Sequence, residues 1–197
     1  MTGAIADCER VLVGLLGQPV NSLTSLAFVV AGAFTWARSH RIVGAASIAT
    51  GVGSFLFHGP MPPGAEWAHD VSLAWLLVAV AAVGTAWERW GGLPALAAIG
   101  AGLAAVPAAG DPLGVAAAVA AIASVLWRQR TPRTWAALVI LGTAAIVGRL
   151  AATGGPLCVP DSLFQGHGFW HLGAAFAVAL WAGVGTSVEN QAMATSS

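Results

Sequence analysis

Two histidines, His167 and His171, stand four residues apart at the start of the last apolar segment of the chain. In a helix this spacing places both imidazoles on one face, one turn apart. Two neutral imidazoles so placed can share a metal ion, and they form part of a zinc site when a third ligand comes from elsewhere. By itself the pattern more often marks two histidines satisfied by hydrogen bonds at a helix start. Its meaning therefore depends on which other polar groups the fold brings to the same depth.

The composition indicates an integral membrane protein surrounded by membrane lipids. Hydrophobic residues make up 57% of the 197 positions and charged residues only 8%, and the mean hydropathy is +0.79. Soluble domains of this size rarely have so few charges. The formal net charge is zero and the chain contains no lysine, which argues against a nucleic-acid partner.

Apolar segments separated by Gly/Pro turns or arginine clusters predict the helices that must position these residues. The segments cover residues 21–37, 42–58, 66–86 and 93–109, a fifth that ends at Trp127, and 134–152 and 167–186. We therefore predict an all-α membrane protein, a single seven-transmembrane-helix bundle over residues 1–197. An amino-terminal segment at 1–19 would lie outside, and a polar tail at 187–197 would lie inside.

The arginines predict the orientation of this bundle. The topology places Arg10 and Arg149 on one side of the membrane. Six arginines lie on the other side: Arg38, Arg41, Arg89, Arg128, Arg130 and Arg133. Cytoplasmic loops carry the excess of positive charge in membrane proteins. We therefore expect the amino terminus outside and the carboxy terminus in the cytoplasm.

In this topology the second helix ends, and the third and seventh helices begin, at the outer side. His58 then lies at the depth of His167 and His171, with Ser54 one turn earlier on the same helix face and Asp70 about one turn into the third helix. Three histidine ligands leave a fourth position open for water, as in catalytic zinc sites. The sequence thus predicts an intramembrane metal site near the outer face.

Each neighbour of this predicted site also has a purely structural explanation. Ser54 could bond a backbone carbonyl one turn earlier, and Asp70 could pair with Arg149 or cap its own helix. His69 competes with Asp70, because adjacent residues point about 100° apart on a helix. Capping explains one or two of a further group of polar residues, and the others would line the site: Asn21, Ser22, Thr24 and Ser25.

Cys8 and Cys158 both fall on the outer side, where an oxidising compartment would permit a disulfide. We predict this bond in preference to two free thiols. It would tie the amino-terminal segment to the loop that precedes His167.

Taken in order, these residues resemble the CREST superfamily of seven-helix membrane hydrolases. The resemblance is carried by the SxxxH pattern of Ser54 and His58, by Asp70, and by the HxxxH pattern of His167 and His171. The alkaline ceramidases are the most similar branch, because two short elements resemble theirs: the Cys-Glu pair at 8–9 and the start of the first helix at 21–26.

The resemblance implies zinc held by His58, His167 and His171, with the amide bond of a ceramide-like lipid as the target. The expected products are a sphingoid base and a fatty acid. Asp70 would accept a proton from water and return it to the leaving amine, and Ser54 would stabilise the oxyanion. A lipid-binding receptor without turnover and, less favoured, a haem protein with paired axial histidines are the alternatives.

Animal ceramidases also carry a calcium site near the amino terminus. Asp7 and Glu9 remain here as candidate Ca²⁺ ligands, but Val11 and Gln18 stand where other ligands would be expected. This departure argues against calcium regulation.

Overall fold

The computed structural model describes residues 4–90 and 92–183, and within them the chain is helical with no strand. This confirms the all-α prediction. The elements in chain order are η1 (Ala4–Asp7), α1 (Pro19–Ser25), α2 (Ala27–Ala37), α3 (Arg41–His58), α4 (Ala65–Ala82), α5 (Trp87–Trp90), α6 (Gly92–Ala105), η2 (Pro107–Ala109), α7 (Gly110–Arg128), α8 (Pro132–Leu150) and α9 (Gly166–Ala182).

Four stretches in the described part are long and apolar enough to cross a membrane: Pro19–Ala37, Ala65–Ala82, Pro107–Arg128 and Pro132–Leu150. The helix at Gly92–Ala105 is apolar but shorter. These helices indicate a membrane protein. The end of the last predicted helix, at residue 186, and the tail at 187–197 lie outside the described residues.

Two predicted helix ends are wrong by one turn, and in each case a local backbone preference explains the difference. The helix predicted to reach residue 86 ends at Ala82, and Gly84 follows with a φ of +77°, which only glycine adopts readily. The helix predicted to reach residue 109 ends at Ala105, because Val106 precedes Pro107 and a residue before proline avoids the helical region.

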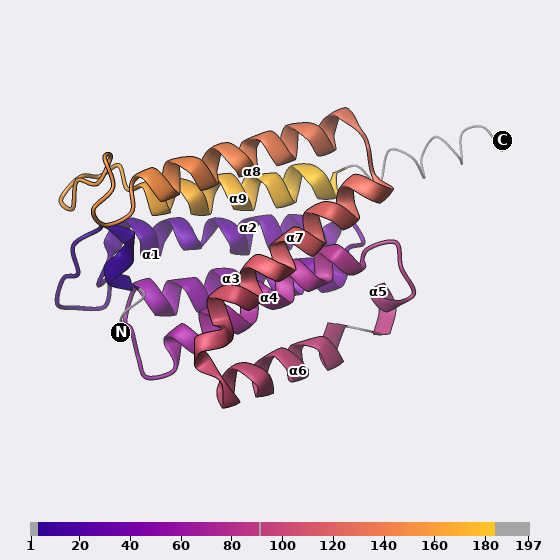
Figure 1. Cartoon of the computed structure of the whole chain (residues 1–197), viewed down its shortest axis with the longest axis horizontal. Helices are drawn as coiled ribbons and strands as arrows, with labels where there is room; N and C mark the ends of the chain where they lie inside the picture. Colours follow the sequence, from indigo (N-terminus) through magenta and orange to yellow (C-terminus); the bar gives the residue numbers. More distant parts are fainter. Residues whose placement is uncertain (1–3, 91, 184–197) are drawn as a thin grey trace.

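The long helices run alternately in opposite directions, so that their ends gather at two ends of one bundle (Figure 1). We call the end with η1, the α3–α4 turn and the α8–α9 loop the histidine end, because His58 and His167 lie there. We call the other, with the α2–α3 turn, α5 and the α7–α8 turn, the arginine end, because Arg38, Arg41 and Arg128 lie there.

Glycine allows α2 and α3 to approach closely. A Cβ atom added at Gly32 would lie 2.7 Å from the carbonyl oxygen of Gly44, and one added at Gly44 would lie 2.7 Å from the backbone nitrogen of Trp36. Small residues at such crossings are typical of helices packed within a bilayer. The crossing fixes the position of α3, which carries Ser54 and His58.

The amino-terminal segment is tied down over the histidine end. Cys8 forms a disulfide with Cys158, which confirms that prediction. The carboxylate of Glu9 accepts hydrogen bonds from the backbone N–H groups of Val20 at 2.8 Å and Asn21 at 2.9 Å. Glu9 therefore caps the first turn of α1, whose backbone donors have no partner within the helix. Neither Asn21 nor Ser22 caps this helix through its side chain.

Candidate metal centre

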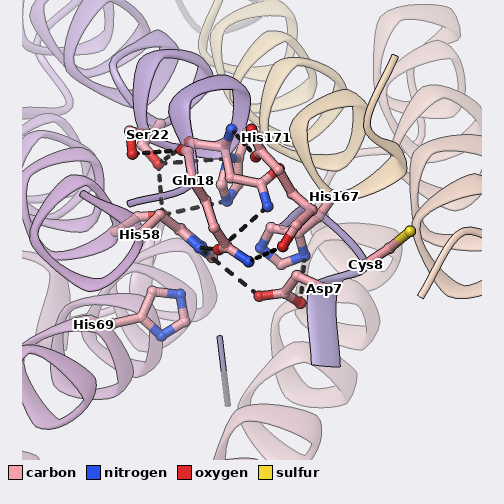
Figure 2. Close-up of polar contacts among 12 residues, drawn as sticks. Asp7, Cys8, Gln18, Ser22, His58, His69, His167 and His171 are labelled. Carbon is pink, nitrogen blue, oxygen red and sulfur yellow. Dashed lines mark hydrogen bonds and ion pairs between the residues drawn. The ribbon is translucent and has the colours of Figure 1, made fainter. Parts of the chain in front are cut away.

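Three histidines from two helices converge at the histidine end. His58 is the last residue of α3, and His167 and His171 lie in the first two turns of α9. Each offers one nitrogen to a common site, and these nitrogens lie within 4.8 Å of one another. Figure 2 shows the rings close together, with Asp7 and Gln18 beside them. The predicted juxtaposition of these three residues is confirmed.

The hydrogen bonds of His58 and His167 determine which ring nitrogen is free. Nδ1 of His58 lies 2.7 Å from Oε1 of Gln18, and Nδ1 of His167 lies 3.1 Å from Oδ1 of Asp7. An amide oxygen and an ionised carboxylate only accept hydrogen bonds, so each Nδ1 carries the proton when Asp7 is ionised. The orientation of the Gln18 amide is supported by its Nε2, which donates to the carbonyl of Glu9 at 2.9 Å. The Nε2 atoms of both histidines are therefore left with a lone pair.

These two Nε2 atoms are buried and have no hydrogen-bond partner among the described residues. Buried polar atoms normally have a partner, and each exception needs an explanation. Metal-binding histidines commonly donate their second ring N–H to a carboxylate or carbonyl, which fixes the ring and its tautomer. The pattern at His58 and His167 therefore fits a bound metal ion.

His171 follows the same rule through hydroxyl groups. Its Nδ1 lies 3.2 Å from Oγ1 of Thr24 and 3.4 Å from Oγ of Ser25. Each of these hydroxyls donates to a backbone carbonyl at 2.7 Å, so each oxygen is available to accept the Nδ1 proton. Nε2 of His171 then faces Oγ of Ser54 at 3.2 Å. Thr24 and Ser25 thus belong to the group of polar residues that was predicted to line the site.

Ser54 is held between two members of the site. Its Oγ lies 2.8 Å from Oγ of Ser25 and 3.2 Å from Nε2 of His171, and the side chain is buried. Ser54 therefore contacts these two side chains, whereas the structural alternative was a hydrogen bond to a backbone carbonyl one turn earlier. The Ser54 hydroxyl is therefore at the free nitrogen of His171, where a reacting oxygen would be close to it.

Asp70 contacts His69 and not the three clustered histidines. Its Oδ1 lies 2.9 Å from Nδ1 of His69, and a Cβ atom added at Gly110, the first residue of α7, would meet its Oδ2. Among the described residues Asp70 makes no ion pair with the three clustered histidines. The His69 ring instead lies next to the cluster, 6.3 Å from the His58 ring between centroids. Asp70 thus reaches the cluster through its neighbour.

Among the described residues Asp7 is the carboxylate in direct contact with the cluster, although the sequence suggested it only as a calcium ligand. Its Oδ1 lies 3.1 Å from Nδ1 of His167 and its Oδ2 lies 3.8 Å from Nδ1 of His58. Burial raises the pKa of Asp7 to about 7; positive charge on His69 opposes this rise, and the carboxylate of Glu9 adds to it. The available sequence signal was its position next to Cys8, whose disulfide leads to the loop before His167.

The two candidate calcium ligands therefore have other partners. Asp7 contacts two histidines, and both carboxylate oxygens of Glu9 accept backbone hydrogen bonds at the start of α1.

Comparison of the chain with protein-family models, with curated proteins and with solved structures finds no match.

Proposed function

We propose that this protein is a zinc-dependent hydrolase of lipid amides that acts within the membrane. The observation that carries the proposal is the convergence of three imidazoles whose Nδ1 atoms are held by neighbouring side chains. Three imidazole nitrogens suit zinc and leave a coordination position open, as in catalytic zinc sites. Zinc bound there would supply a Lewis acid for the activation of water and of a carbonyl group.

Side chains next to the histidines would stabilise the oxyanion and transfer the proton. Ser54 would donate a hydrogen bond to an oxyanion by turning its one hydroxyl proton away from Ser25 and from Nε2 of His171, which it contacts in the structure. Asp70 accepts the Nδ1 proton of His69, so that Nε2 of His69 can take a proton from water and deliver it to the leaving amine. The predicted role of Asp70 is then exercised through His69.

The membrane setting supports a lipid substrate. Seven helices would cross the bilayer with the amino terminus outside and the carboxy terminus in the cytoplasm, which puts the arginine end inside. His58 and His171 are buried and His167 is half-buried, close to the opposite end of the bundle. A ceramide-like amide is the substrate that the resemblance to alkaline ceramidases supports, with a sphingoid base and a fatty acid as products.

Metal analysis and product release on the same preparation test this function. Purified protein should hold about one zinc per chain and release fatty acid from a panel of long-chain lipid amides, detected by mass spectrometry. His171→Ala should lose both zinc and release. Ser54→Ala should keep zinc and lose turnover, whereas Ser124→Ala, a matched serine at the arginine end, should keep both.

Each alternative function gives a different result in this experiment. Zinc without release from any amide would indicate a receptor and contradict the proposed hydrolase. Absence of zinc together with visible absorption would indicate haem. Protein free of metal and inactive after zinc addition would exclude the proposed mechanism.

A further inference from the structure

Two irregular segments at the histidine end expose large apolar side chains. One segment joins η1 to α1 and the other is the α8–α9 loop, and Figure 1 shows both of them beyond the ends of the long helices. Both lie outside the candidate membrane spans, so the lipid contact of a spanning helix does not explain their exposure. Eight exposed side chains on these segments form what we call the apolar loop patch: Val11, Leu12, Val13, Leu15, Leu157, Val159, Leu163 and Phe164.

The two segments are tied to each other. The disulfide of Cys8 with Cys158 joins them, and the backbone N–H of Arg10 donates to the carbonyl of Pro160 at 3.1 Å. The exposed charged side chains of the two segments are Arg10 and Asp161, and they pair with one another at 2.6 Å. The patch therefore lies on one connected unit whose surface charges neutralise each other.

The first segment carries its apolar side chains on a fixed loop. The backbone N–H of Leu12 donates to the carbonyl of Gly17 at 2.7 Å, which closes the loop. The backbone N–H of Gly17 in turn donates to the carbonyl of Gly59 at 3.0 Å, directly after the end of α3. Val13, between these two bonds, is fully exposed. Its side chain therefore projects from a loop whose base is held by the rest of the protein.

The α8–α9 loop is held in a similar way by a buried glutamine. The Nε2 atom of Gln165 donates to the carbonyl of Ser162 at 2.6 Å and to that of Val159 at 3.2 Å. Leu163, next to this anchor, is 90% exposed. This side chain also projects from a fixed loop instead of folding back onto the protein.

An apolar helix surface continues from each loop. The ring of Phe164 lies 6.0 Å from that of Phe169 between centroids, and Phe169, Leu172 and Phe176 are exposed on one face of α9. An exposed apolar helix face of this kind is typical of a helix in lipid. The other loop leads into the candidate membrane span Pro19–Ala37. The patch is thus continuous with apolar membrane-type surface on both of its segments.

We propose that the apolar loop patch inserts into the lipid leaflet at the histidine end and anchors both segments there. Large exposed apolar patches mark contacts with proteins or with membranes. A protein partner must pack at the density of a protein interior, whereas side chains that project separately from two loops suit a fluid partner. The pairing of Arg10 with Asp161 also leaves no net surface charge on the two segments to attract a charged protein.

The backbone of the two segments sets how deep the patch reaches. Irregular backbone does not enter hydrocarbon where it faces lipid, because its N–H and C=O groups would lose their hydrogen bonds. The side chains therefore reach the boundary between headgroups and acyl chains, about 5–10 Å into the interface, and the backbone stays among the headgroups. This placement does not depend on the function of the histidine site.

Fluorescence quenching of the full chain in phosphatidylcholine vesicles tests the insertion. The two native cysteines are bonded to each other, so an introduced cysteine takes an NBD label and the wild type takes none. The label in Val13→Cys and in Leu163→Cys should be quenched by nitroxide-labelled lipids at a depth of about 5–10 Å and protected from iodide on both sides of the membrane. Asp111→Cys is the matched control, because Asp111 is exposed in the first turn of α7 at the same end of the bundle. Its label should be quenched by iodide and not by the lipids.

Two results would overturn the proposal. Iodide quenching at positions 13 and 163 as strong as at position 111, without quenching by the lipids, would place the patch in water. Protection from both quenchers would mean that protein covers the patch, and it would exclude lipid as the partner. Elution of each variant on size exclusion as the wild type does reports folding, and if one of the two loop variants does not fold, the other decides alone.

Discussion

Replacing Asp7 with asparagine is expected to weaken zinc binding about 10- to 100-fold, or about 1.4–2.8 kcal/mol. The carboxylate contacts Nδ1 of His167 at 3.1 Å and approaches Nδ1 of His58 at 3.8 Å. Asparagine keeps the size and one acceptor oxygen but removes the negative charge, and charge-assisted hydrogen bonds are roughly twice as strong as neutral ones. The NH₂ group of the asparagine would also face the protonated Nδ1 of His58 or His167, and two donors cannot form a hydrogen bond with each other. Both effects loosen the rings that hold the metal.

A zinc titration against a chelator of known affinity, on protein in detergent, measures this change. Asp161→Asn is the matched control, because Asp161, in the α8–α9 loop, pairs at the surface with Arg10 of the amino-terminal segment, and an exposed ion pair contributes little. Asp70→Asn should leave zinc affinity within about threefold but lower turnover about 10²- to 10⁴-fold. Wild-type zinc affinity in Asp7→Asn, together with lost affinity in His167→Ala, would show that Asp7 does not support the metal site. An equal loss in Asp161→Asn would assign the effect to the segment as a whole.

Three further predictions concern the support of the site and the helix packing. Gln18→Leu leaves the Nδ1 proton of His58 without its buried acceptor, so zinc affinity should fall about tenfold in the same titration; unchanged affinity would show that Gln18 does not orient His58. Cys8→Ser releases the segment that carries Asp7, and thermal unfolding should show a loss of about 2–5 kcal/mol, with Cys158→Ser giving the same result; a difference between the two would indicate another role for one thiol. Gly44→Ala places a Cβ against the backbone of α2 and should cost about 1–3 kcal/mol, whereas Gly102→Ala, with open space around it, should be neutral or slightly stabilising; equal effects would mean that the close crossing is not needed.

The depth of each polar residue could be predicted because turns and arginine clusters mark where apolar helices end. Gly59 and the prolines that follow it end α3 directly after His58, and the loop before Gly166 starts α9 just ahead of His167. Alternating helix direction then brings these residues to one end of the bundle. The three histidines, Ser54 and the disulfide of Cys8 with Cys158 followed from that reasoning alone.

The rotation of α4 about its own axis, which decides whether His69 or Asp70 faces the histidines, could not be predicted from the sequence. His69 and Asp70 lie at nearly the same depth, and their directions differ by about 100°. The packing of α4 against α3 and α7 turns His69 toward His58 and leaves Asp70 beside Gly110. No periodic pattern in the sequence predicts that His69 rather than Asp70 faces His58.

The all-helical membrane character and the meeting of the three histidines could be predicted from the sequence, because hydrophobic length and turn residues act locally along the chain. The groups that hold those histidines are visible only in the folded chain. Asp7 and Gln18 come from an irregular segment without periodicity, and they reach the rings only because Glu9 caps α1 and a disulfide ties the segment down. Contacts of this kind depend on long-range geometry, which residue spacing does not encode.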